Sequence, residues 1–328
     1  MSKPEAVLQQ MPWVVKQIIV DNSDTVSKLS FRQSCKDYNT VVDLSPITYE
    51  KLSIVYHCIP RRVEVTLSID NKKDNDVEFK PTPTGYKMGN QKEGTLKEEN
   101  KIDVIDATWA YLKKKIFEKP KVELKTLEMF IPPPYGKAEL YQTEKTQFLE
   151  KLGVAMGSVD RKQAIETVQL EWNGNQQDLL NVLSHLEPGT LKTINMVLVA
   201  SNEPTDETPG KIELAQVAQL LQWKQAEHLD IGDYFLDIPF DDWKHFNTIQ
   251  AQITEVTNAS FAEMVRGFIA NESFSKCRLF PDSSYELKTL VTSTGLQKKR
   301  VKGGGFKVFI GEKGLKITAG NGITFEKL

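Results

Sequence analysis

The first segment whose residue types could do chemistry is a glycine-rich loop, Lys302-Gly303-Gly304-Gly305. Such a loop could suggest a phosphate site. A phosphate-binding loop leads into a helix and is followed by lysine and then serine or threonine, because backbone N–H groups at the helix start meet the phosphate. Here the glycines precede the strand-like run 306–310. The pattern therefore favours a turn.

The residue types that bind metals lack the spacing of a metal site. An EF-hand calcium loop needs a central glycine and a final glutamate, and the acidic run here has neither. Zinc sites place His or Cys at short spacing, whereas each histidine here stands alone. A Gly-x-Ser-x-Gly nucleophile elbow is also missing. We therefore expect no catalytic residue, no metal and no cofactor. The residues considered are Asp230, Asp233, Asp237, Asp241, Asp242, His57, His185, His228 and His245.

Composition narrows the classes of function that remain possible for the chain. The 328 residues allow about two domains. A net charge of -2 argues against binding to nucleic acid or a membrane surface. No apolar run approaches the roughly 20 residues that span a bilayer, and residues 1–20 hold no uninterrupted signal-peptide core. Cys35, Cys58 and Cys277 lie far apart, which suits a reducing compartment. We expect a cytoplasmic or nuclear protein whose function is binding.

Residues 8–48 predict three short helices with apolar residues on one side. Pro12 suits a first helical position, and the pairs 14–15 and 18–19 then recur at helical spacing. A segment of this size cannot enclose a core unaided. Its apolar side should therefore lie against a partner protein, or else the helices form a small cap on the main domain.

The same residues resemble an F-box. That pattern has Leu-Pro, then an Ile/Leu-rich helix, then a helix with Leu-Arg and Cys-Lys. Met11 stands here in place of the leucine, and Val14 or Val15 in place of the acidic residue common after Leu-Pro. The resemblance implies a Skp-type adaptor and a cullin-RING ligase as partners. The residues it implies in adaptor binding are Met11, Pro12, Val15, Ile18, Ile19, Leu29, Arg32, Cys35 and Tyr38.

Residues 49–100 predict a small β meander and a loop. Apolar residues at every second position mark strands within 52–56 and 63–69, followed by a turn at 71–75. The polar stretch 89–101 has no periodicity and is interpreted as a flexible loop. Residues 102–117 then predict an amphipathic helix.

The part from residue 101 to 285 alternates short strands with amphipathic helices. Strands are predicted within 127–131, 168–172, 194–198, 229–231, 249–253 and 277–279, and helices over 146–156, 176–186, 214–225 and 260–270. This alternation favours parallel strands. A doubly wound sheet would make the strands apolar on both faces, whereas these alternate apolar and polar residues. We therefore predict an irregular, leucine-rich-repeat-like arc with helices on one face.

The other face of the arc would be polar and free to bind a target protein. The residues expected there are Glu128, Gln169, Glu171, Asn195, His228, Asp230, Gln250, Gln252 and Arg278. Glycine and Asn-Gly signals in residues 286–328 predict a C-terminal β meander that packs on the end of the arc. The expected fold class is thus α/β with an all-α N-terminal unit and small meanders before and after the arc.

Two strings within the arc, LEPGTLK at 186–192 and QWKQAEHL at 222–229, followed by IPF at 238–240 and HF at 245–246, are similar to the FTH domain of nematode-type F-box A proteins. The resemblance covers roughly residues 124–282. It implies a non-catalytic substrate-recognition subunit of an SCF-type ubiquitin ligase. Two alternatives remain: an interaction scaffold without a role in ubiquitin conjugation, and an enzyme with an unrecognised site in the arc.

Overall fold

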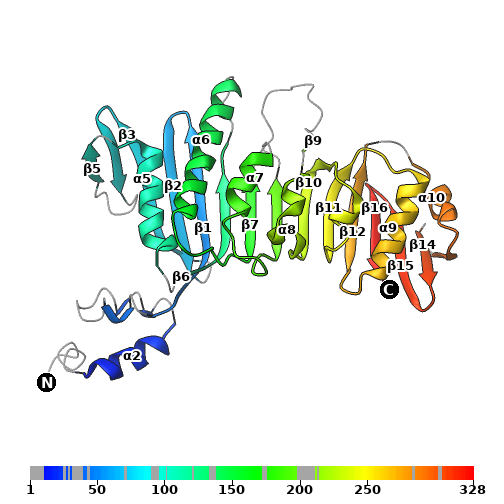
Figure 1. Cartoon of the computed structure of the whole chain (residues 1–328), viewed down its shortest axis with the longest axis horizontal. Coiled ribbons are helices and arrows are strands. Elements are labelled where there is room, and N and C mark those ends of the chain that lie inside the picture. The colour runs from blue at the N-terminus through cyan, green and yellow to red at the C-terminus, as the bar shows by residue number, and fades with distance from the viewer. Residues whose placement is uncertain are drawn as a thin grey trace.

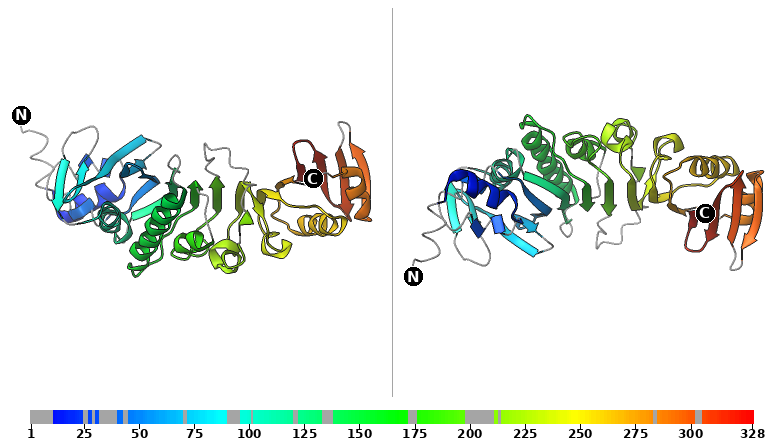
Figure 2. Two further views of the ribbon diagram at one scale, coloured as in Figure 1. Left: turned by 90° about the horizontal axis from the view of Figure 1, so that it is seen from above. Right: turned by 90° about the horizontal axis from the view of Figure 1, so that it is seen from below.

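The computed structural model describes residues 11–24, 27–28, 30–31, 40–42, 45–69, 72–89, 96–100, 102–119, 122–132, 138–171, 176–197, 211–212, 214–282, 285–301 and 305–328. Their strands form one long mixed sheet, and the larger helices lie over one of its faces (Figure 1, Figure 2). Helix α2 (Trp13–Asp21) lies apart from these helices, below the N-terminal end of the sheet.

The central strands run parallel to one another. In spatial order they are β1 (Ile47–Cys58), β6 (Val122–Phe130), β7 (Thr167–Glu171), β8 (Thr193–Val197), β10 (His228–Leu236), β11 (Thr248–Ile253) and β12 (Lys276–Pro281). The short β9 (Lys211–Ile212) also pairs with β10. Alternate apolar residues such as Leu127, Ile194 and Leu279 are buried. This confirms the predicted parallel run with helices on one face.

The helices follow the strands along the chain. They are α5 (Val104–Leu112) with its π-helical extension η1 (Lys113–Phe117), α6 (Ala138–Gly157), α7 (Gln176–Leu183), η2 (Val217–Gln219), α8 (Leu221–Lys224), η3 (Phe240–Asp242), α9 (Asn258–Ala270) and α10 (Leu287–Ser293). The single helix predicted over 214–225 is wrong, because Leu220 is extended and separates η2 from α8. Helix α9 begins before the predicted residue 260, because Thr257 is its N-cap.

Four antiparallel strands extend the sheet beyond β1. They are β2 (Arg61–Ile69), β3 (Lys72–Thr82), β4 (Gly85–Gly89) and β5 (Leu96–Asn100). The turn predicted at 71–75 is wrong, because β3 begins at Lys72, opposite Ile69. The loop predicted over 89–101 is wrong at 96–100, where β5 pairs with β4. Residues 90–95 and 101 lie outside the described ones. An edge strand is held by backbone pairing on one side and can lack an apolar pattern.

The predicted C-terminal meander is present and joins the same sheet through β12. Its strands are β16 (Ile323–Lys327), β15 (Lys313–Ala319), β14 (Gly305–Ile310) and β13 (Gln297–Val301), in that spatial order. The edge strand β13 exposes Lys298, Lys299 and Arg300. Like charges along an edge discourage pairing with a strand of another chain. At the other end, β1 pairs in parallel with β6, so both meanders and the arc share one continuous sheet.

Candidate binding surfaces on the sheet and at the N-terminal helix

The face of the sheet opposite the helices carries polar residues in rows that cross the strands. Most of the residues expected to bind a target lie side by side in one such row. In spatial order they are Glu128, Gln169, Asn195, Asp230, Gln250 and Arg278. Neighbours in the row belong to adjacent strands and so are about 5 Å apart. The row exists because parallel strands of the same polar–apolar alternation pair in register.

A second row lies beside the first and was missed by the sequence analysis, apart from His228. Its members are Thr126, Thr167, Thr193, His228, Thr248 and Lys276. Threonine is common in strands for packing reasons, so it gives no functional signal in a sequence.

The remaining expected residues lie elsewhere on the sheet. Gln252 pairs with Phe235 and Phe280, outside both rows. Glu171 ends β7, and its side chain lies outside the described ones. Glu128, although in the first row, already forms an ion pair with Lys51 at 3.1 Å.

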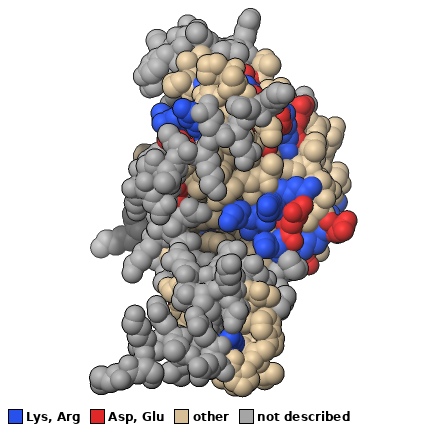
Figure 3. Space-filling view, turned by 90° about the vertical axis from the view of Figure 1, so that its left-hand side faces the viewer, with Lys and Arg blue, Asp and Glu red and all other residues tan. Residues whose placement is uncertain are grey.

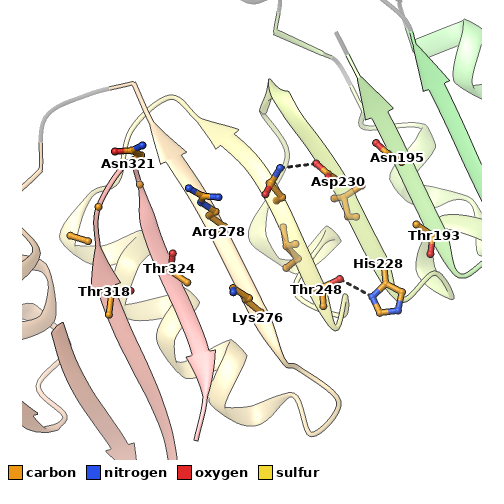
Figure 4. Close-up of a pocket in the computed structure, with 16 residues that line it drawn as sticks. Thr193, Asn195, His228, Asp230, Thr248, Lys276, Arg278, Thr318, Asn321 and Thr324 are labelled. Atoms are coloured by element: carbon orange, nitrogen blue, oxygen red, sulfur yellow. Dashed lines mark hydrogen bonds between the residues drawn. The ribbon is translucent and has the colours of Figure 1, made fainter. Parts of the chain in front are cut away.

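The two rows lead into a pocket of about 620 Å³ near the C-terminal end of the sheet. Its floor comes from β8, β10, β11 and β12, and its wall from the hairpin that joins β15 to β16 (Figure 4). The pocket brings together Asn195, His228, Asp230, Gln250 and Arg278, and it excludes Glu128, Gln169 and Gln252. We call it the corner pocket. The hairpin residues were not predicted to belong to a site, since only the sheet order brings them to β12.

Cross-strand hydrogen bonds fix two side chains of the corner pocket. His228 Nδ1 lies 2.7 Å from Thr248 Oγ1. Gln250 Nε2 donates to Asp230 Oδ1 at 3.2 Å (Figure 4). The Gly232 N–H, on the same strand as Asp230, donates to the same oxygen at 3.1 Å. The Asp230 carboxylate is thus held by neutral donors.

The cations of the corner pocket lie on β12. Lys276 Nζ is 3.6 Å from Glu326, which also accepts from Lys316 at 3.1 Å. The Arg278 guanidinium lies 4.9 Å from the centre of the Phe280 ring. Within the described part of the chain, Arg278 forms no ion pair with a carboxylate. The part of the pocket floor that β12 forms therefore carries the positive charge.

Helix α2 forms a second candidate surface. Val14, Val15 and Ile18 are 66%, 40% and 56% exposed, whereas Val20 is buried on the other side of the helix. Pro12 is exposed, and Met11 and Ile19 are half-buried. The other expected adaptor residues, Leu29, Arg32, Cys35 and Tyr38, lie outside the described residues.

Basic side chains gather at the N-terminal end of the molecule (Figure 3). Helix η1 carries Lys113, Lys114 and Lys115, the run interpreted from the sequence as surface. Lys113 Nζ lies 3.6 Å from Glu118, and Lys115 Nζ lies 6.0 Å from the centre of the Tyr111 ring. Lys113 and Lys115 thus have partners within their own segment of the chain.

The strings that carry the FTH resemblance shape the loops before β8 and β10. Gln222 Nε2 donates to the buried Leu186 carbonyl at 2.7 Å, and Trp223 Nε1 donates to the Asp242 carbonyl at 2.8 Å. The Lys192 carbonyl accepts from the N–H groups of Glu227 and His228. These bonds fix where the two strands start and hence the register of the polar rows.

Two further searches cover the described residues alone. No group of three or more His, Cys, Asp or Glu side chains there could hold a metal ion. None of the helices there has the length and apolarity needed to cross a membrane.

Comparison with known families gives one match. The profile of the FTH domain matches residues 146–292, which contain both strings and the strands of the pocket floor. The match begins later than the residue 124 expected from the sequence. No F-box profile matches the chain. A search of curated proteins finds no match to it.

Proposed function

We propose, on the premise that residues 146–292 form an FTH domain, that this chain is a substrate receptor of an SCF-type ubiquitin ligase. The FTH domain is associated with F-box proteins, and its family is generally non-catalytic. The open face of the sheet holds a target protein, and the N-terminal helices bind a Skp-type adaptor. The chain then contributes proximity between target and ligase rather than acid–base groups.

The observation that carries the adaptor half of the proposal is the outward apolar side of α2. Val15 and Ile18 lie three residues apart, so they share one side of the helix. Both are exposed, together with Val14 at 66%, which lies four residues before Ile18. Exposed aliphatic and aromatic side chains that gather in one patch are typical of a protein–protein interface.

The experiment replaces the apolar patch with charge. In the full chain, Val15→Asp with Ile18→Asp should abolish capture of a purified Skp-type adaptor, because both carboxylates would be buried at the interface. The matched control is Val154→Asp on α6, where the valine is 72% exposed. Circular dichroism checks that the fold is kept. Adaptor capture that survives the double substitution would refute the adaptor half.

A scaffold without a ubiquitin role is the second candidate. Two observations favour it: no F-box profile matches, and Met11 stands in place of the leucine of that pattern. A scaffold would bind its target equally well with and without the α2 substitutions, and ubiquitination of that target in cells would not depend on them. A receptor would lose ubiquitination of the target while retaining target binding.

A further inference from the structure

We infer that the corner pocket binds an acidic segment of the target protein, and that the β15–β16 hairpin, outside the FTH match, completes the site. This inference rests on the proposed function, because it takes the open face as the target site. It adds the chemistry of the partner and a part of the chain that sets it.

The site is composite. The floor strands β8, β10, β11 and β12 lie within residues 146–292, whereas the lining residues Thr318 to Gly322 and Thr324 follow that range. At Gly322 an added Cβ would lie 2.5 Å from the Leu279 carbonyl oxygen. The hairpin backbone therefore packs directly on β12, and glycine permits this close approach. The wall is held against the floor by main-chain contact.

The charge of the pocket selects the partner. Lys276 and Arg278 alternate along β12 and so share one face. Lys276 and Lys316 share the single carboxylate of Glu326, and Arg278 has no carboxylate partner in the described chain. The Phe280 ring lies 4.9 Å from the Arg278 guanidinium, which leaves the N–H edge available for a bidentate contact. The lining thus holds two cations, Lys276 and Arg278, and the one carboxylate of Asp230 on the far side of Gln250, so an acidic side chain complements Arg278.

The opposite side of the pocket favours a protein segment over a nucleic acid. Asp230 lies in the same row as Arg278, with Gln250 between them, at about 10 Å for two strand spacings. A continuous polyanion that crossed the row would bring its phosphates to this carboxylate. A peptide can place an acid at Arg278 and a hydrogen-bond donor at Asp230. The pocket therefore favours a peptide that carries both an acidic side chain and a hydrogen-bond donor.

The test is selection of peptides from a displayed library of random sequences against the full wild-type chain. We expect Asp or Glu to be enriched at one position. Arg278→Ala should weaken binding of the selected peptides about ten-fold or more, because a charge-assisted bond is lost. Arg278→Glu should switch the preference to Lys or Arg. Arg300→Ala, an exposed arginine on β13, is the matched control and should change nothing.

A pair of glycine variants tests the hairpin. Gly322→Ala should weaken the same peptides several-fold, because its Cβ would push the hairpin off the Leu279 carbonyl. Gly320→Ala in the same turn meets nothing within 4 Å and should bind like wild type. Equal binding by both variants would exclude the hairpin from the site.

Several results would overturn the acidic partner. They are selection of no peptide, no enrichment of acids, the same preference in Arg278→Glu, or tighter binding of phosphoserine peptides, single-stranded RNA or anionic vesicles than of the acidic peptides. None of these measurements involves the adaptor. Failure here therefore leaves the result of the α2 substitutions standing, and the two proposals can fail separately.

Discussion

Lys145 Nζ on α6 lies 3.0 Å from Asp178 Oδ2 on α7, and both side chains are almost completely buried. Burial lowers the pKa of Lys145, and the neighbouring Asp178 opposes that shift. Two helices that cover the sheet are thus joined by a buried ion pair. Removing one member would leave the other charge buried without its partner.

We therefore expect Lys145→Met to lower the free energy of unfolding by about 3–5 kcal/mol. The double variant with Asp178→Leu should regain most of the loss, because no charge is then left in the core. Urea unfolding followed by circular dichroism measures both. Lys151→Met is the control: its partner Asp106 is half-exposed, so the cost should stay below about 1 kcal/mol. Equal costs for the two lysines would contradict this account.

Gln222→Ala should also destabilise the fold, by about 1–3 kcal/mol, because the buried Leu186 carbonyl would lose its donor. Gln225→Ala, at the end of the same helix, removes an exposed side chain and should cost little. Urea unfolding again compares the two. If both variants match wild type, the bond to Leu186 does not hold the start of β8.

Cys58 and Cys277 should be unreactive in the native protein. Burial, with a smaller effect from Glu144, raises the pKa of Cys58 to about 12. Burial also raises the pKa of Cys277. The thiolate is the reactive form, so iodoacetamide at mildly alkaline pH should modify both residues only after denaturation. Mass spectrometry of the peptides reads each site, and rapid native labelling of either cysteine would contradict its burial.

Stability should fall as the pH drops below the ordinary imidazole pKa of 6.5. Burial lowers the pKa of His57, His185 and His245 in the folded chain, so the unfolded chain binds more protons in this range. These histidines therefore cost no stability above pH 6.5. As the pH falls below 6.5, the free energy of unfolding decreases until the folded-state pKa values are reached.

Urea midpoints across this pH range measure the slope, and His245→Gln should make it shallower. The carboxyls of Glu272 and Glu326, whose pKa values are lowered by lysine partners, act at more acidic pH. An unchanged slope in His245→Gln would assign the dependence to other groups.

Sequence alternation predicted the central strands well because one face of the sheet is buried under helices. The periodicity of apolar residues missed elements that lack such a pattern. β5 is an edge strand, and α8 is a single helical turn that the extended Leu220 separates from η2. The polar row from Glu128 to Arg278 was predictable, since alternation fixes the face and parallel pairing fixes the register. The corner pocket was not, because the distant hairpin reaches β12 only through the order of the strands.

The FTH strings illustrate a different limit. The two strings were distinctive enough to indicate the domain. Within them, however, Gln222 and Trp223 donate hydrogen bonds to the backbone carbonyls of Leu186 and Asp242. Residues that identify a family can thus be those that hold its fold together, whereas Arg278 lies outside the two strings and the hairpin lies outside the matched range.

The unbroken pairing of β1 with β6 has a mechanical consequence. The two proposed binding surfaces, on α2 and at the corner pocket, lie toward opposite ends of one sheet of hydrogen-bonded strands (Figure 1). The distance between these two surfaces is then set by the number of strands that lie between them. Inserting or deleting one strand–helix unit would lengthen or shorten that span without altering either end.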